Sequence, residues 1–145
     1  MFDLRSWTRD RPRVMGIINL TPDSFSDGGR FFGRDLALAQ AETMLADGVD
    51  MLDLGAESTR PGASPVSAQQ ELDRLGSVLE ALRGFPVPLS VDTSSPEVMR
   101  EALRQGVAVL NDVRALRRPG AMELAAAHKA AVCLMHMPAE PDVMQ

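Results

Sequence analysis

Cysteine is nearly absent from this chain, which limits how the fold can be held together. Cys133 is the single cysteine among 145 residues, so the chain cannot form an internal disulfide. A reducing compartment suits such a protein, and we predict a cytoplasmic location. Cys133 lies within an apolar run, residues 131–135, which predicts a buried strand position.

Long hydrophobic runs and an excess of positive charge are also lacking. No run approaches the ~20 apolar residues that a membrane helix needs, and the first residues contain no signal-peptide core. The formal net charge is −5, which disfavours nucleic acid and anionic membrane surfaces as partners. We therefore predict no nucleic-acid partner and no membrane partner. A local group of arginines would still suit a small anionic ligand.

What the sequence does contain is the composition of one ordinary globular domain. Hydrophobic residues make up 45% and charged residues 24% of the chain, which is enough to form a core. No internal repeat, low-complexity segment or linker divides it. We therefore treat residues 1–145 as a single domain.

Short apolar runs alternate with helical patterns along this domain. The runs predict strands at residues 14–18, 49–54, 87–91, 107–110 and 131–135, and the first of these is expected to be fully buried. Helical spacing predicts helices at residues 35–47, 68–83, 96–105 and 119–129. Residues 1–12 are expected to form a lead-in with a short edge strand, and residues 19–33 a long functional loop.

Alternating strands and helices predict a parallel sheet. An open doubly wound sheet is one possibility, but the first strand lacks the G-x-G-x-x-G turn of that class. Polar residues follow every strand instead, which favours a (β/α)8 TIM barrel with its site at the strand ends. Such a barrel needs roughly 250 residues. The chain is thus expected to cover roughly the first five βα units, incomplete at the carboxyl end.

Five polar motifs mark the ends of the predicted strands. They are GIINLTPDSFSDGG (residues 16–29), DLGAESTRPG (53–62), SVDT (90–93), NDV (111–113) and MHM (135–137). Together they resemble the dihydropteroate synthase family in content, order and interval. The resemblance covers the chain from about Val14 onward. It implies a TIM barrel that condenses 6-hydroxymethyl-7,8-dihydropterin diphosphate with p-aminobenzoate, forming 7,8-dihydropteroate and pyrophosphate in folate synthesis, with sulfonamides as competitors.

The resemblance assigns roles to three strand-end residues. Asn19 matches the asparagine associated with Mg2+, and Asp92 and Asn111 match the residues that hold the pterin. An amide oxygen suits Mg2+, and a carboxylate suits the pterin N–H donors. Without the resemblance, a strand-end asparagine is more often a turn or cap residue, and Asp92 would be taken for a carboxylate at a helix start.

Two loops complete the implied site. Thr59, Arg60 and Pro61 match the residues that grip the substrates, with Thr59 near the diphosphate and the other two on the p-aminobenzoate side. Ser24 and Phe25 would close over the bound substrates as part of a lid. The resemblance also implies a homo-oligomer, a dimer in the full-length enzyme.

The chain departs from the family pattern in places. Pro138 and Ala139 stand where the family has Gln-Gly, and Ser95 stands where a basic residue is common. Family residues on the last three strands have no counterpart in these 145 residues. Two alternatives therefore remain: a non-catalytic pterin-binding fragment or half-barrel, whose open sheet edges would favour self-association, and a pterin-dependent methyltransferase on the same barrel.

Overall fold

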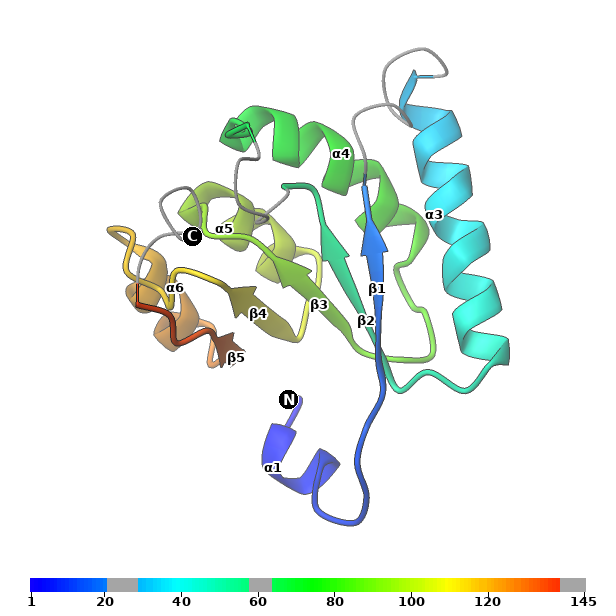
Figure 1. Ribbon diagram of the computed structural model, residues 1–145, viewed down its shortest axis with the longest axis horizontal. Helices are drawn as coiled ribbons and strands as arrows, with labels where there is room; N and C mark the ends of the chain where they lie inside the picture. Colours follow the sequence, from blue (N-terminus) through cyan, green and yellow to red (C-terminus); the bar gives the residue numbers. More distant parts are fainter. Residues whose placement is uncertain (21–28, 58–63, 139–145) are drawn as a thin grey trace.

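The chain forms a five-stranded parallel sheet with helices on one side (Figure 1). The computed structural model describes residues 1–20, 29–57 and 64–138. The strands lie in chain order: β1 (Met15–Asn19), β2 (Met51–Gly55), β3 (Leu89–Asp92), β4 (Val109–Asp112) and β5 (Ala131–Leu134). All four pairings are parallel, as expected for five consecutive βα units of a TIM barrel.

The crossover helices form a single layer in which each packs on the next. They are α3 (Gly29–Ala46), α4 (Ala68–Ala81), α5 (Pro96–Arg104) and α6 (Ala121–Ala127). Two begin at strong sequence signals. Ser67 and Gln70 make a capping box at α4, and Ser95 caps α5 with Pro96 at its first position. Gly48 and Gly106 follow α3 and α5 with φ of +89° and +93°, the left-handed geometry that glycine adopts at low cost.

The core lies between this helical layer and one face of the sheet. Ile18, Leu54 and Val91 are buried on three neighbouring strands and belong to the same cluster as Leu75 and Val78 of α4. Residues alternate between faces along a strand, so the residues on either side of these three point away from the helices. The sheet therefore has an apolar side that faces the helices and an inner side that carries polar residues at the strand ends.

Two burial predictions were wrong because the inner side is open in the described part of the chain. β1 was expected to be fully buried, but Ile17 is 57% exposed and only Ile18 is buried within the strand. Cys133 was expected to be buried and is exposed. Ile17 and Cys133 lie on the inner side, whereas the apolar pattern had suggested cover on both faces.

Two element predictions were also wrong. Residues 1–12 contain the short helix α1 (Leu4–Trp7), capped by the Asp3 side chain, where an edge strand was expected. α3 begins at Gly29, inside the loop expected to run to residue 33. No helix in the described ranges has the length and apolar character needed to cross a bilayer.

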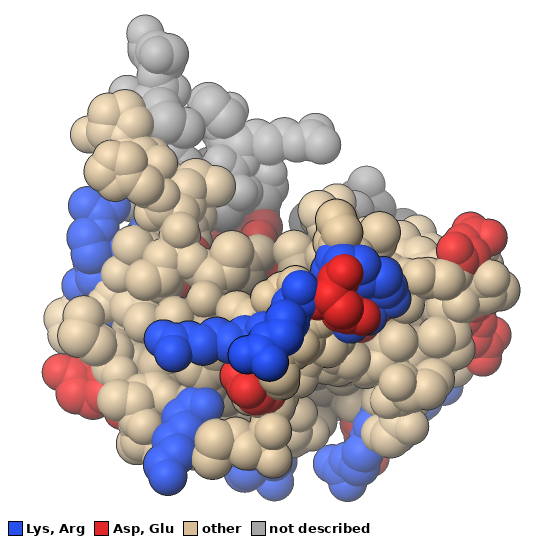
Figure 2. Space-filling view, turned by 90° about the horizontal axis from the view of Figure 1, so that it is seen from below, with Lys and Arg blue, Asp and Glu red and all other residues tan. Residues whose placement is uncertain are grey.

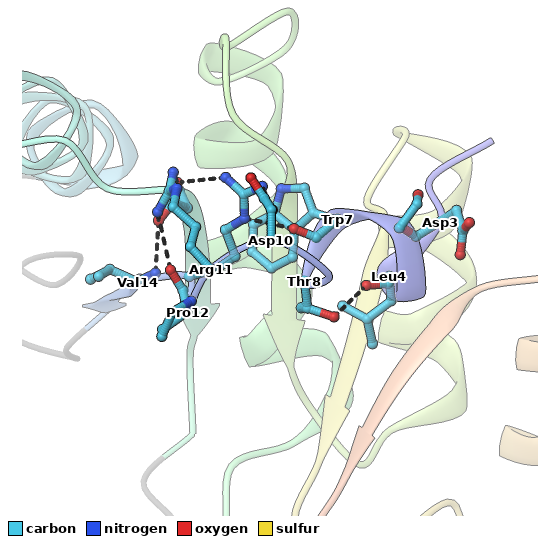
Figure 3. Close-up of polar contacts among 11 residues, drawn as sticks. Asp3, Leu4, Trp7, Thr8, Asp10, Arg11, Pro12 and Val14 are labelled. Atoms are coloured by element: carbon cyan, nitrogen blue, oxygen red, sulfur yellow. Dashed lines mark hydrogen bonds and ion pairs between the residues drawn. The ribbon is translucent and has the colours of Figure 1, made fainter.

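Hydrogen bonds attach the segment after α1 to the sheet near the amino ends of the strands (Figures 1 and 3). Asp50, just before β2, accepts hydrogen bonds from the Arg11 guanidinium and from the Val14 backbone N–H. The Arg11 hydrogen bond is the main cause that holds the pKa of Asp50 well below its usual range. The Arg13 guanidinium lies 5.4 Å from the Trp7 ring centroid. The face seen in Figure 2 carries both basic and acidic side chains.

Gly16 of β1 lies against the side chain of Met44 of α3, and its replacement by alanine should be destabilising. A Cβ there would lie 2.7 Å from Met44 Sδ and 3.0 Å from Val49 Cγ2. We expect Gly16→Ala to lower the free energy of unfolding by about 1–2 kcal/mol in urea titrations. Gly76→Ala is the matched control, since nothing lies within 4 Å of a Cβ at that helical position. It should raise stability by about 0.5–1 kcal/mol. Equal effects of the two would contradict this account.

Candidate functional site

Four residues form one row across the carboxyl ends of β1 to β4. Asn19 pairs with Gly55, Gly55 with Asp92, and Asp92 with Asn111 in the strand register. Neighbouring strands are about 4.8 Å apart, so the three polar side chains of the row span about 15 Å on the inner side. The structure thus brings together Asn19, Asp92 and Asn111, which the sequence could place only on separate strand ends.

Asp53 lies beneath this row and links two strands through its carboxylate. It is 2% exposed and shares the inner side, two residues before Gly55. Ser90 Oγ donates to Asp53 Oδ1 at 2.6 Å, and Asn111 Nδ2 donates to Asp53 Oδ2 at 3.1 Å. The hydrogen-bond partners of Asp53 are therefore side chains of β3 and β4. The bond to Asp53 uses one N–H of the Asn111 amide, so the side-chain oxygen can accept from a ligand and the second N–H can donate to one.

The environment of Asp92 favours the neutral form of its carboxyl group. Burial is the main cause that raises its pKa from 3.8 to about 7, and the nearby carboxylates of Asp53 and Asp112 add to the rise. It does not cap α5, because the Ser95 side chain fills that position. A ligand that offers N–H donors to Asp92 would favour the charged form and relieve this penalty.

Gly55 leaves room between Asn19 and Asp92. A Cβ at Gly55 would lie 3.8 Å from Asp92 Oδ2 and 3.9 Å from Asn19 Oδ1, so the glycine keeps the space between two oxygen atoms open. Among the described residues, no three His, Cys, Asp or Glu side chains gather as a metal site. Mg2+ commonly takes only one or two protein oxygens beside water and substrate phosphates, so the exposed Asn19 amide fits such an ion.

A second buried carboxylate shapes the backbone directly after Asn111. Asp112 is fully buried, and its oxygens accept from Ser94 Oγ at 2.5 Å, Arg114 N at 2.9 Å and Leu116 N at 2.8 Å. The turn that it holds contains Ala115 and Leu116 at φ of 54° and 58°, which are unfavourable for residues with a Cβ. Asp112 therefore offsets local strain next to the row.

An arginine joins three of the strand-end segments. The Arg114 guanidinium contacts Ser94 Oγ at 3.1 Å and Glu57 Oε2 at 3.9 Å, so the segments after β2, β3 and β4 meet at this side chain. Sequence reasoning missed Arg114, Ser94, Ser90 and Asp112 as parts of the site. The NDV motif included Asp112, yet nothing in the sequence identified its partners.

The remaining site predictions fall in other places. Thr59, Arg60 and Pro61, together with Ser24 and Phe25, lie outside the described residues. His136 of the MHM motif is exposed after β5. His128, the exposed residue directly after α6, has its Nδ1 3.0 Å from the Leu124 carbonyl oxygen.

Comparison with known proteins assigns the chain to one family. A family model described as pterin binding enzyme matches residues 15–145. Dihydropteroate synthase of Haemophilus influenzae is 51% identical over 135 residues, which is 92% of this chain and 49% of the relative. That of Escherichia coli K12 is 50% identical, also over 92% of this chain and over 48% of the relative. The chain therefore spans about half the length of these curated relatives.

Solved structures of dihydropteroate synthases superpose on most of this chain. Yersinia pestis dihydropteroate synthase in complex with a sulfonamide drug superposes with a TM-score of 0.84 at 54% identity, over 93% of this chain and 50% of that one. The Xanthomonas albilineans enzyme with 4-aminobenzoic acid gives 0.81 at 52% identity, over 89% and 48%. The Burkholderia cenocepacia enzyme with 7,8-dihydropteroate gives 0.80 at 47% identity, over 92% and 44%.

Proposed function

Because the chain belongs to the pterin binding enzyme family, we propose that it supplies the amino-terminal half of a dihydropteroate synthase. The reaction joins 6-hydroxymethyl-7,8-dihydropterin diphosphate to p-aminobenzoate and releases pyrophosphate. The observation that carries this proposal is the register-aligned row of Asn19, Gly55, Asp92 and Asn111 at the carboxyl ends of four parallel strands.

In this proposal Asp92 and Asn111 hold the pterin. The Asp92 carboxylate accepts from the 2-amino group and the ring N–H of the pterin, which are adjacent donors on one edge. The Asn111 oxygen accepts a further hydrogen bond, while Asp53 engages one N–H of the amide. The row therefore orients the pterin so that its methylene carbon faces the incoming amine, and this positioning lowers the barrier to substitution.

The proposal includes Mg2+, whose chemistry when bound is to neutralise charge on the departing diphosphate. Asn19 would hold it with its amide oxygen. Thr59, Arg60 and Pro61 would grip the substrates, and Ser24 and Phe25 would cover the p-aminobenzoate. We also propose a homo-oligomer and a cytoplasmic location for the whole protein. Sedimentation velocity of the purified protein tests the oligomer, and fluorescence imaging in the source cell tests the location.

Removing the amide oxygen of Asn19 should raise the Mg2+ requirement. We expect Asn19→Ala to increase about tenfold the Mg2+ concentration that gives half-maximal formation of 7,8-dihydropteroate. Asn19→Asp should lie nearer to wild type because it keeps an oxygen ligand. EDTA should abolish turnover, and added Mg2+ should restore it. The same Mg2+ titration curve for wild type and Asn19→Ala would contradict the assignment.

The test of the function is product formation. This chain, alone and joined to the carboxyl-terminal half of the Haemophilus influenzae relative, is incubated with both substrates and Mg2+, and 7,8-dihydropteroate is measured by chromatography. We expect sulfonamide-sensitive product from the joined protein. Pterin diphosphate binding without product would support the alternative of a non-catalytic pterin-binding fragment. Absence of both product and binding would overturn the proposal.

A further inference from the structure

A buried glutamate lies behind the proposed pterin site on the helix-facing side of the sheet. Glu71 of α4 is 1% exposed, although a glutamate is almost never fully buried without a partner. Its partner is Thr93, whose Oγ1 donates to Glu71 Oε2 at 2.7 Å. This contact joins α4 to the residue that follows Asp92.

Thr93 is the point at which three elements meet. Its backbone N–H donates to the Asn111 carbonyl oxygen at 3.0 Å, which ties it to β4. Its Oγ1 also accepts from the Ser95 backbone N–H at 3.1 Å, which ties it to the start of α5. Adjacent residues of an extended segment point to opposite faces, so Thr93 faces the helices where Asp92 faces the inner side. Glu71 therefore holds from behind the backbone that presents Asp92.

Several charged groups face Glu71. Glu57 approaches from the segment after β2, and Arg114 and Arg118 approach from the segment after β4, while Asp92 of β3 lies on the opposite side of the sheet. Burial is the main cause that raises the pKa of Glu71 to about 7, while the Thr93 hydrogen bond opposes the rise. The charge of Glu71 adds to the rise of the Asp92 pKa, so the protonation of Glu71 affects a carboxyl on the inner side of the sheet.

We propose that Glu71 is a positioning residue of the pterin site, which fixes the Asp92 carboxyl through Thr93. This inference rests on the proposed function for its ligand. A glutamate that only packed α4 on the sheet would change stability when replaced, but it would leave the pterin affinity of the folded chain and its pH profile unchanged.

The experiment is a calorimetric titration of four variants with 6-hydroxymethyl-7,8-dihydropterin diphosphate between pH 5.5 and 8.5. Thr93→Val removes the hydroxyl and should weaken binding about tenfold, whereas Thr93→Ser keeps it and should bind within about twofold of wild type. Glu71→Gln keeps an oxygen acceptor but not the charge, so the pH midpoint of binding should move down. Glu80→Gln is the matched control, because Glu80 is an exposed glutamate of the same helix, and it should change nothing.

Three outcomes would overturn the inference. They are wild-type affinity in folded Thr93→Val, no rescue by Thr93→Ser, and a pH profile of Glu71→Gln that superposes on that of wild type. Amide hydrogen exchange at residues 92–95 tests the hold of Glu71 without any ligand, and faster exchange is expected in Glu71→Leu, which offers no acceptor to the Thr93 hydroxyl, than in Glu71→Gln, which keeps one. Failure of wild type to bind the pterin would instead overturn the proposed function, and the exchange result would still decide whether Glu71 holds this backbone.

Discussion

Asp92→Asn should nearly abolish pterin binding and at the same time stabilise the chain. The proposed role needs a carboxylate that accepts two N–H donors, and asparagine offers one acceptor and one clashing donor. We expect an affinity loss of about 100-fold or more. The same carboxyl has a pKa raised to about 7, mainly by burial, so ionising it in the folded chain costs free energy.

The sign of the pH effect follows from this pKa. Between about pH 4 and pH 7 the folded chain keeps a proton on Asp92 that the unfolded chain has released, so the free energy of unfolding falls as pH rises. At pH 8 we expect Asp92→Asn to be about 1–3 kcal/mol more stable than wild type. Pterin affinity of wild type should rise from pH 5.5 to pH 8, since the ligand needs the charged form.

Urea unfolding at pH 5.5 and pH 8, with pterin titrations at both, measures the two effects together. Asp73→Asn is the control, because Asp73 is an exposed carboxylate on α4 that accepts from Gln69 Nε2. It should alter neither quantity. If Asp92→Asn kept wild-type pterin affinity, or lost stability at pH 8, the assignment of Asp92 would be wrong.

Asp112→Ala should be the most destabilising single change among the described residues of the site. It would leave the Ser94 hydroxyl and the N–H groups of Arg114 and Leu116 without their acceptor in a buried turn. The turn also holds Ala115 and Leu116 in the left-handed region, a strain that the carboxylate offsets. We expect a loss of about 3–5 kcal/mol in the free energy of unfolding.

Asp112→Asn separates the effect of the carboxylate charge from the effect of the hydrogen bonds that Asp112 accepts. It keeps an oxygen acceptor and should lose about half as much stability as Asp112→Ala. Asp73→Ala is again the control and should stay within about 0.5 kcal/mol of wild type. Both are measured by urea unfolding at pH 7. A loss below about 1 kcal/mol for Asp112→Ala would show that the turn does not depend on this carboxylate.

The fold was largely predictable from the sequence because each of its signals is local. Short apolar runs predicted five strands, and Ser95 with Pro96 predicted the start of α5. The ends of β1 to β4 were predicted one or two residues early, since Asn19, Asp92 and Asn111 are polar and were placed after their strands. In the sheet they belong to the strands, because their backbone groups pair with neighbours whatever their side chains are.

What the sequence could not predict depends on which segments become neighbours. The bond from Asn111 to Asp53 joins residues 58 apart, and the bond from Thr93 to Glu71 joins a strand end to a helix. Neither has a local signature. Glu71 lies one helical turn before the buried Leu75. A glutamate at such a position is nevertheless predicted to be exposed to solvent unless its partner is known. The openness of the inner side depends likewise on the three-dimensional arrangement.

The central claim is that the row of Asn19, Gly55, Asp92 and Asn111 binds the pterin. The most direct test is a titration of 15N-labelled chain with 6-hydroxymethyl-7,8-dihydropterin diphosphate, followed by NMR. We predict the largest shifts at the Gly55 and Thr93 backbone amides and the Asn111 side-chain amide, and none of these in Asp92→Asn. Saturable shifts confined to other residues, or the same shifts in Asp92→Asn, would contradict the claim.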